Sequence, residues 1–436
     1  MASTYLTRTP STAGNRKTWT FSAWVKRSGL GGEQNLLAAD NNNRIIFSTV
    51  DSNDQFGLSD TNTSTMDVQT NQVFRDVSAW YHIVVAFDTT QATASNRVKL
   101  YVNGSQVTSL ARSNYPTQNA DFSINNNTIQ NIGRSAAGSS YFDGSMSHIH
   151  FIDGAAYDAT AFGEVDSTTG QWKINTSPTI ADYGTNGFFI LKDGNSVTDQ
   201  SGKGNNFTVG GGTLTKTEDN PSNVFATLNP LNIQSSGFSI GNGNNTVISN
   251  TNNTSWKTLY STLGASTGKF YWEQKITGSN STAHFIGATD IDKMKNSNAN
   301  DFEDTNTDAY AYIPDGKIIS KNVQSTYGDT WTTNDIIGVA LDLDNSKIFF
   351  SKNGVWQNSG NPQNGTNPAY TITSGIIYTP ATATFYTNNT YQMNFGNGYF
   401  GTTAVASAGT NASGIGIFEY DVPTGYTALS TKGLNL

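Results

Sequence analysis

The sequence predicts an all-β protein made of two antiparallel β-sandwiches. Short apolar and aromatic runs alternate with Asn-, Asp- and Gly-containing turn clusters along the 436-residue chain, which has 42 Gly and 10 Pro. The 8 Trp, 19 Tyr and 23 Phe provide large side chains for more than one core. The chain is also long enough for two or three domains. The pattern shows no heptads, and a single helical turn is expected, in residues 158–164.

The most informative segment is residues 334–356, with the sequence NDIIGVALDLDNSKIFFSKNGVW. Its two apolar runs, IIGVALDL and KIFF, are separated by the turn-forming residues Asp344, Asn345 and Ser346. Asn353 and Gly354 follow, and these two residue types most readily adopt the positive φ angles of a type I′ hairpin turn. The segment therefore predicts consecutive antiparallel strands with tight turns.

Together with KFYWE at residues 269–273, this hairpin resembles the SPRY (B30.2-like) domain, a bent β-sandwich. The resemblance covers residues 234–436 with a C-terminal tail. It implies a domain that binds partners through its loops, in a family whose members share no catalytic activity.

A different order of segments is found before residue 175. WTFSAWVK, WYHIVVAFD, VKLYVNG, IGR and YFDGSMSHIHF follow one another and resemble the laminin G-like, concanavalin A-like jelly roll. That resemblance covers residues 1–175. A Gly/Asn-rich bridging strip is expected at 176–233, with its best linker candidate at 210–223. The segment DQSGKGNNF at 199–207 also resembles laminin G-like proteins, so the alternative is that the strip as far as Phe207 belongs to the first domain.

A laminin G-like module joined to a SPRY-like module resembles virion fibre, spike and decoration proteins of tailed phages, including marine phages. The resemblance implies a non-enzymatic virion surface protein that binds a host surface glycan or receptor through its sandwich loops. The alternatives are a purely architectural capsid or tail protein contacting other virion proteins, and a concanavalin A-like glycoside hydrolase. Virion surface proteins commonly oligomerise, so a homo-oligomer is expected, with a trimer favoured.

Composition narrows the function classes. The net charge is −8 and the pI about 5.0, which argues against nucleic-acid binding because that requires a basic surface. No apolar stretch is long enough to span a bilayer, and the first residues lack the apolar core of a signal peptide. The chain has no Cys, so disulfides and thiolate chemistry are excluded. These features favour a protein made in the host cytoplasm that reaches the virion without secretion.

The loop containing Tyr327, Asp329 and Trp331 is the candidate ligand-binding site. Two aromatic side chains beside an acid suit stacking on a sugar ring or anchoring a protein partner. The alternative is that Trp331 closes one end of the sandwich as a core residue.

Calcium is the one cofactor that the sequence suggests. Laminin G-like folds often hold a calcium ion at the sandwich rim, and the oxygen-rich loops at Asp40 and at Asp51 and Asp54 could supply ligands. The same residue types are favoured in β-turns, so turn formation is the alternative.

Other candidate catalytic and metal-binding residues are better explained by structural roles. Asp342 and Asp344 lie two apart and face the same side of a strand, as paired glycosidase carboxylates could, but they also fit a hairpin and its turn. His148 and His150 share a strand face and lack an obvious third metal ligand. No residues form a Gly-x-Ser-x-Gly nucleophile elbow before a helix.

Overall fold

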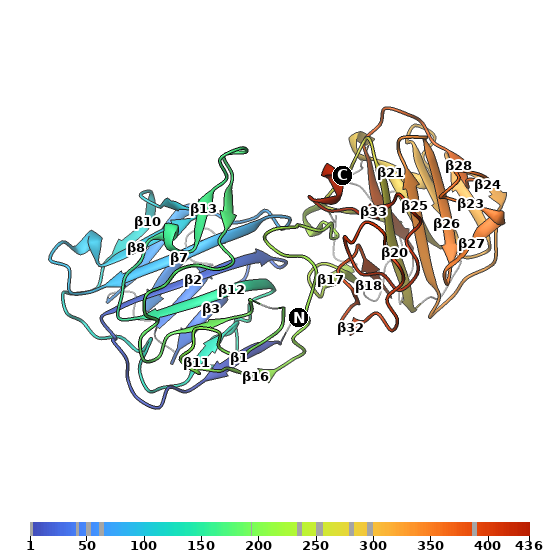
Figure 1. Cartoon of the computed structure of the whole chain (residues 1–436). Helices are drawn as coiled ribbons and strands as arrows, with labels where there is room; N and C mark the ends of the chain where they lie inside the picture. The colour runs from blue at the N-terminus through green and yellow to red at the C-terminus, as the bar shows by residue number, and fades with distance from the viewer. Residues whose placement is uncertain are drawn as a thin grey trace. The chain divides into compact units, whose positions relative to one another are not determined.

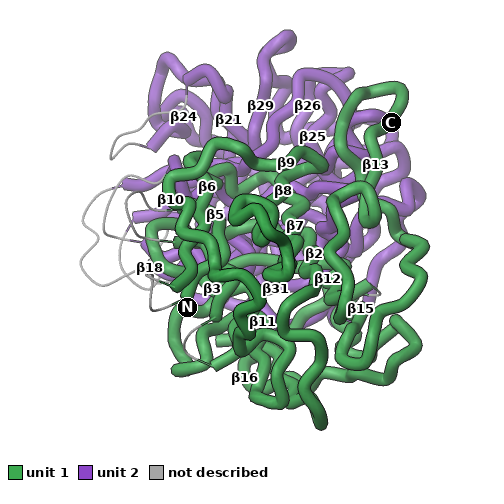
Figure 2. The backbone as a smooth tube through the Cα atoms, turned by 90° about the vertical axis from the view of Figure 1, so that its left-hand side faces the viewer, with its two compact units in different colours: residues 1–216 green, residues 217–436 purple. Residues whose placement is uncertain are grey.

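The computed structural model describes residues 3–40, 43–48, 54–60, 65–192, 194–232, 238–249, 256–278, 283–293, 300–385 and 390–436. These residues form strands, turns and short 3-10 helices, with no α-helix among them, so the predicted all-β fold class is confirmed. The chain divides into two compact units, residues 1–216 and 217–436 (Figures 1 and 2). Each unit contains two large β-sheets.

The first unit packs an eight-stranded sheet against a six-stranded sheet. In pairing order the eight strands are β10 (Leu110–Asn114), β6 (Asp67–Val73), β5 (Gln55–Asp60), β4 (Asn43–Ser48), β3 (Gln34–Ala39), β11 (Gln130–Ile132), β1 (Tyr5–Arg8) and β16 (Thr208–Gly211). The six strands are β15 (Phe188–Ile190), β12 (Gly144–Asp153), β2 (Thr18–Arg27), β7 (Trp80–Asp88), β8 (Val98–Val102) and β9 (Ser105–Gln106). Figure 1 shows both sheets.

Alternation along the strands builds the core of this unit. In the pairing of β2 with β7, Phe21 lies opposite Val85 and both side chains enter the core between the sheets. Trp19, two residues before Phe21, stacks on Phe87 with ring centroids 4.6 Å apart. The apolar positions therefore recur every second residue, as a sheet with one face in the core requires.

The predicted bridging strip of residues 176–233 is not a separate element, because the two units share it. In the first unit, β15 pairs with β12, and Phe207 packs edge-on against Phe188 at 4.7 Å. In the second unit, Phe225 is buried and Ala226 donates a backbone hydrogen bond to Leu429. The boundary at 216/217 falls inside the predicted linker at 210–223.

The second unit packs a nine-stranded sheet against a six-stranded one. The main path of the larger sheet is β17 (Phe238–Gly241), β18 (Thr246–Ser249), β30 (Thr390–Asn394), β20 (Lys269–Gly278), β25 (Ile336–Asp342), β26 (Lys347–Lys352) and β27 (Val355–Trp356), with β28 (Tyr370–Thr371) beside β26 and β33 (Thr427–Ala428) beside β20. The smaller sheet contains β19 (Lys257–Tyr260), β29 (Tyr378–Thr384), β21 (His284–Asp290), β22 (Ala309–Tyr312), β23 (Lys317–Ser320) and β24 (Val323–Thr326).

The predicted hairpins are present in this sheet. β25 and β26 pair from Asp342 opposite Lys347, and the turn residues lie between them. β26 then pairs with β27 across Asn353 and Gly354, whose φ angles are 49° and 80°. Both angles are positive, as the predicted type I′ turn requires.

Segments outside the two sandwiches cover the outer faces of three sheets. In the first unit, residues 155–183, which include β13 (Gly163–Val165) and β14 (Trp172–Ile174), pack on the six-stranded sheet. In the second unit, the turn η5 (Asp301–Glu303) packs on the smaller sheet, and residues 415–428 pack on the larger sheet. These covers bury a second apolar layer on each of the three sheets.

The shared strip leads to a prediction about independent folding. Fragments 1–216 and 217–436 should each unfold cooperatively in a thermal melt followed by circular dichroism, because each keeps its own core. Fragment 1–175 should melt at a lower temperature or fail to fold, because it lacks β15 and the buried rings of Phe188 and Phe207. Equal melting of fragments 1–175 and 1–216 would contradict this assignment of the strip.

Candidate ligand-binding surface

The structure places the two aromatic residues of the predicted binding loop inside the second unit. Tyr327 is 6% exposed and Trp331 is 3% exposed, and both belong to the core between the sheets. Their rings lie against Tyr312, with centroids 5.5 Å and 6.1 Å away. Asp329 is exposed, but its backbone N–H donates to Gln357 and its carbonyl accepts from Tyr312. Trp331 is therefore a core residue, as the alternative interpretation predicted. The expectation that Tyr327 and Trp331 form an exposed binding surface is wrong, because both side chains are buried.

The predicted calcium loops do not come together as a metal site in the described residues. Asp54 is 2% exposed, and its carboxylate accepts from Arg27 at 2.7 Å and from Arg75 at 3.1 Å. Burial opposes ionisation of Asp54, but hydrogen bonds from the Gly31 N–H and Arg27 lower its pKa below the usual value. Asp40 is half-buried, and Asp51 lies outside the described residues. Within the described ranges, no three His, Asp or Glu side chains are grouped as metal ligands would be.

The other candidate carboxylates have structural partners. Asp342 is buried. It accepts hydrogen bonds from Asn345 and forms an ion pair with Lys269 at 3.0 Å. Asp344 accepts from the backbone N–H of Gly268 at 2.7 Å. Both residues therefore hold the hairpin and its neighbouring loop, as the structural alternative predicts.

The histidine pair is buried under the cover of the first unit. The pairing of β12 with β2 is irregular between Ser147 and His150, which separates His148 from His150 in register. His150 is 2% exposed, and its Nδ1 lies 2.9 Å from the hydroxyl of Tyr183. Burial lowers the pKa of His150 well below its usual value, so the ring is neutral and enclosed.

Glu273 is the most strongly perturbed acid in the second unit. It is fully buried, and its carboxylate accepts from the N–H groups of Glu419 and Tyr420, both at 2.9 Å. It also accepts from Tyr271 and Asn394 at 3.1 Å. Burial raises the pKa of Glu273 to about 7, although the hydrogen bonds oppose the change. A perturbed carboxylate can indicate a catalytic site, but this one is enclosed and anchors the C-terminal cover.

The outer face of the eight-stranded sheet differs from the three covered faces. Among the described residues it carries no apolar cluster on its outer side, and its outward positions are mostly polar. Strand pairing aligns these positions in two rows across the sheet. The first row is Arg112, Gln69, Gly57, Ile46 and Asn35, and the second is Asp67, Ser59, Arg44, Ala38, Asn131 and Thr7. We call these two rows, with Glu33, the polar face.

Two ion pairs form the accessible layer of the polar face. Arg44 pairs with Glu33 at 2.7 Å, with side chains 15% and 24% exposed. Arg112, with its side chain 26% exposed, pairs with the buried Asp67 at 2.7 Å. Gln69 donates to the other carboxylate oxygen of Asp67, also at 2.7 Å. Planar guanidinium and carboxylate groups are thus held in place at the surface by one another.

A second polar layer lies beneath these pairs. Asn35 and Asn131 are 0% exposed and Gln69 is 1% exposed. Asn35 Oδ1, Gln69 Oε1 and Asn131 Nδ2 are buried and have no hydrogen-bond partner in the described part of the chain. A buried polar atom without a partner costs roughly 1–3 kcal/mol, so these amides form a costly polar layer under the ion pairs.

Aromatic groups lie at the β1 end of this face. The guanidinium of Arg134 stacks 3.5 Å from the ring centroid of Tyr5, and Tyr141 lies 6.2 Å from the same ring. All three residues are half-buried. Gly210 and Gly211 lie under the ring of Tyr5, where a Cβ would collide with it. The polar face therefore ends at an accessible cluster that can stack against a flat ligand.

The sequence contained a signal for this surface, although the loop prediction missed it. Arg44 and Ile46, and Asp67 and Gln69, occur at alternate positions of two β-prone runs, which places each pair on one face. The strand order was the missing information, because β6, β5, β4 and β3 must be neighbours before these residues meet.

Comparison with protein families agrees with the geometry of both units. Residues 2–160 match the family model of the concanavalin A-like lectin/glucanases superfamily. Residues 269–398 match the family model of the SPRY domain. The chain carries a concanavalin A-like domain followed by a SPRY domain. Both predicted resemblances, and their order along the chain, are confirmed.

Solved structures similar to the chain include two human SPRY domains and a toxin. The SPRY domain of human HERC1 is 16% identical with a TM-score of 0.31, and the match covers 38% of this chain and 96% of that one. Another human SPRY domain is 17% identical with a TM-score of 0.28, covering 36% and 94%. Stonustoxin is 15% identical with a TM-score of 0.31, covering 39% of this chain and 27% of the toxin. A comparison with curated proteins found no match.

In the described ranges, no helix has the length and apolar character needed to cross a bilayer.

The position of Trp331 gives a stability prediction. Trp331→Ala should lower the free energy of unfolding by about 3 to 5 kcal/mol, the usual cost of truncating a large core side chain. Val323→Ala, at a position that is 68% exposed, is the control and should change stability by less than about 0.5 kcal/mol. Denaturant unfolding measures the stability of both variants. An unchanged midpoint for Trp331→Ala would contradict the core position of this side chain.

The buried carboxylate gives a pH prediction. The pKa of Glu273 in the folded protein, about 7, exceeds its ordinary value of 4.5, so the folded state binds the proton more tightly. This group's contribution to the free energy of unfolding should therefore fall as the pH rises from 4.5 to 7, by roughly 3 kcal/mol at 1.36 kcal/mol per pKa unit. Glu273→Gln should flatten the pH dependence of stability. Denaturant unfolding at about pH 5 and about pH 8 measures this, and parallel slopes for both proteins would contradict it.

Proposed function

We propose that this protein is a non-enzymatic recognition protein of a virion surface, and that its concanavalin A-like domain binds a host surface glycan. The single observation that carries the proposal is the polar face of the eight-stranded sheet. Three sheet faces are sealed by apolar covers, and this fourth face presents paired charges and an aromatic end above a layer of buried amides. The proposal moves the binding site from the sandwich loops expected from the sequence to a sheet face.

The chemistry of the polar face suits a saccharide. Sugar hydroxyls both donate and accept hydrogen bonds, and the planar groups of Arg44 and Arg112 with their carboxylate partners offer both functions. The C–H face of a sugar ring packs on aromatic surface, which Tyr5 and Tyr141 supply. The face has cations and anions in pairs, so a neutral ligand is favoured over a strongly charged one.

A non-enzymatic role is favoured by where the acids lie. Glu273 and Asp342 are buried, and Asp67 is held by Arg112 and Gln69. Glycoside hydrolysis requires two carboxylates facing each other across an open cleft, and none of these three carboxylates is placed in that way. A glycan that binds should therefore be recovered uncleaved.

The virion location rests on the arrangement of the chain. A concanavalin A-like domain followed by a SPRY domain, in a cysteine-free chain with 13% charged residues, resembles the surface proteins of tailed phages. A homo-oligomer, with a trimer favoured, would present several polar faces at once and raise avidity for a repeated glycan.

A glycan array probed with the full chain tests the proposal. The array should retain the protein on at least one neutral glycan class. Arg44→Lys combined with Arg112→Lys should then weaken binding at least tenfold, or about 1.4 kcal/mol, because lysine keeps each ion pair but loses the planar fork. Arg97→Lys is the matched control, since Arg97 bonds backbone carbonyls on the six-stranded sheet side and should leave affinity unchanged.

Four outcomes would count against the proposal. Retention of no glycan would favour the architectural alternative, and equal binding by the double variant would move the site off the polar face. Release of reducing sugar from a bound glycan would revive the hydrolase alternative. Labelled antibody imaging of intact particles decides the location, because absence from the particle surface is incompatible with attachment.

A further inference from the structure

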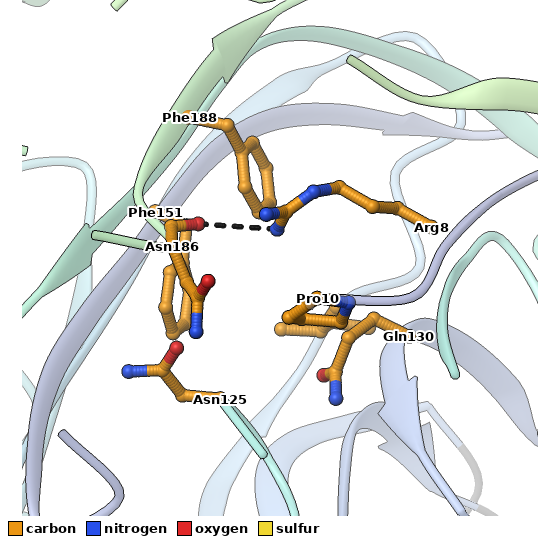
Figure 3. A pocket seen from close by; sticks show the side chains of 8 residues that line it. Arg8, Pro10, Asn125, Gln130, Phe151, Asn186 and Phe188 are labelled. Atoms are coloured by element: carbon orange, nitrogen blue, oxygen red, sulfur yellow. Dashed lines mark hydrogen bonds between the residues drawn. The ribbon is translucent and has the colours of Figure 1, made fainter. Parts of the chain in front are cut away.

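A small cleft opens at the rim of the first unit, between β1 and β11 of the eight-stranded sheet and β15 of the six-stranded sheet. It is lined by Arg8 from β1, Gln130 from β11 and Phe188 from β15, with Asn125 and Asn186 from adjoining loops. Figure 3 shows the carboxamides of Asn125 and Asn186 on one side, Gln130 on the other and Arg8 above them. The cleft is separate from the polar face, because Arg8 and Gln130 occupy the inward positions of their strands.

Asn125 is the group that points to a ligand. It is 2% exposed, and its Nδ2 donates to Asp153 at 2.6 Å and to the carbonyl of Asn15 at 3.0 Å. These bonds fix the orientation of the amide and leave Oδ1 buried with no partner in the described part of the chain. The backbone of Asn125 also has a φ of 68°, a left-handed conformation that non-glycine residues adopt at a cost.

Arg8 supplies donors on the opposite side. Its Nη1 donates to the carbonyl of Asn186 at 3.3 Å, and its Nη2 donates to Asn205. A guanidinium has five N–H donors, so further donors remain for a ligand. Gln130 is held through its Nε2, which donates to the carbonyls of Ser123 and Thr128, so its Oε1 is the end left to accept. The cleft thus combines fixed acceptors with a fixed donor.

Charge and size restrict the ligand. Burial lowers the pKa of Arg8, and the attraction of Asp199 and Asp153 raises it, so both carboxylates lie near the guanidinium. The nearby acids disfavour an anion, and the guanidinium disfavours an ammonium group. The free volume is about 10 Å³, the space of one water-sized group, and Pro10, Phe151 and Phe188 form apolar walls.

We propose that this cleft binds a hydroxyl group at the end of a neutral saccharide, with the hydroxyl donating to Asn125 Oδ1 and accepting from Arg8. A hydroxyl has one donor and two acceptor sites, which matches the lining. The cleft has room for the hydroxyl alone, so the carbon that bears it would lie outside the cleft. The choice of a saccharide over another neutral alcohol rests on the proposed function, and the cleft would be a second subsite on the other side of β1 and β11.

Ligand-observed saturation-transfer NMR with the full chain tests this site. The probes are the methyl glycosides of glucose, galactose and mannose at about 20 mM, because a single hydroxymethyl contact is expected to bind in the millimolar range. The hydroxymethyl protons of at least one probe should receive the strongest saturation. Sodium acetate and ammonium chloride should not displace it.

Two cleft variants should weaken this binding at least tenfold. Arg8→Lys keeps the charge but loses the planar donor array, and Leu37→Phe places a ring in the cleft, which Leu37 also lines. Arg97→Lys and the volume-conserving Leu37→Met are the matched controls and should bind as the parent does. Thermal melts check that each variant is folded, and Arg8→Lys carries the test if Leu37→Phe is not.

The outcomes separate this inference from the proposed function. Hexoside binding that survives in the Arg44→Lys and Arg112→Lys double variant but is lost in Arg8→Lys supports the cleft. No saturation of any hexoside, or equal saturation in the parent and both cleft variants, overturns the cleft and leaves glycan binding on the polar face untouched. Displacement by acetate or ammonium overturns the neutral-hydroxyl assignment.

Discussion

Both β-sandwiches depend on how the outer faces of their sheets are kept from water. A sheet that packs one face in a core still has a second face, and apolar surface there costs about 25 cal/mol per Å² when exposed. Three of the four large sheets solve this with an apolar cover from elsewhere in the same unit. The eight-stranded sheet instead has polar outward positions held by ion pairs. The covers occupy the outer faces of three sheets, and the two regions proposed for binding, the polar face and the rim cleft, lie outside them.

Each cover is hydrogen-bonded to its sheet, and these bonds account for several of the buried polar groups in the two units. Trp172 Nε1 donates to His82 Nδ1 at 3.0 Å, and the burial of His82 lowers its pKa to about 3. Tyr260 donates to Asp301 at 2.8 Å beneath η5, and Glu273 accepts the N–H groups of the C-terminal segment. A hydrogen bond in a low-dielectric environment is strong only in its correct geometry. These hydrogen bonds therefore fix the position of each apolar cover on its sheet, which apolar contacts alone would not specify.

Much of the fold could be predicted from the sequence because its signals are local. The Asn353–Gly354 turn, the alternation in β2 and the order of the β-prone runs all depend on neighbouring residues. The candidate site depended on distant ones. The burial of Trp331 is set by Tyr312 and His284 on other strands, and Asp54 meets Arg27 across 27 positions of sequence. Composition alone could not tell an oxygen-rich turn from a metal site, because both use the same residue types.

The two proposed binding regions of the first unit have a common origin in the alternation of β1 and β11. Along β1, Tyr5 and Thr7 face outward, whereas Leu6 enters the core and Arg8 reaches the rim cleft. Along β11, Asn131 faces outward and Gln130 faces the cleft. A one-residue slip of either strand would exchange these sets, since side chains alternate with a period of two. The pairing of β1 with β11 therefore positions both regions at once, and a ligand long enough to pass around this edge would meet the polar face and the cleft in a fixed relation.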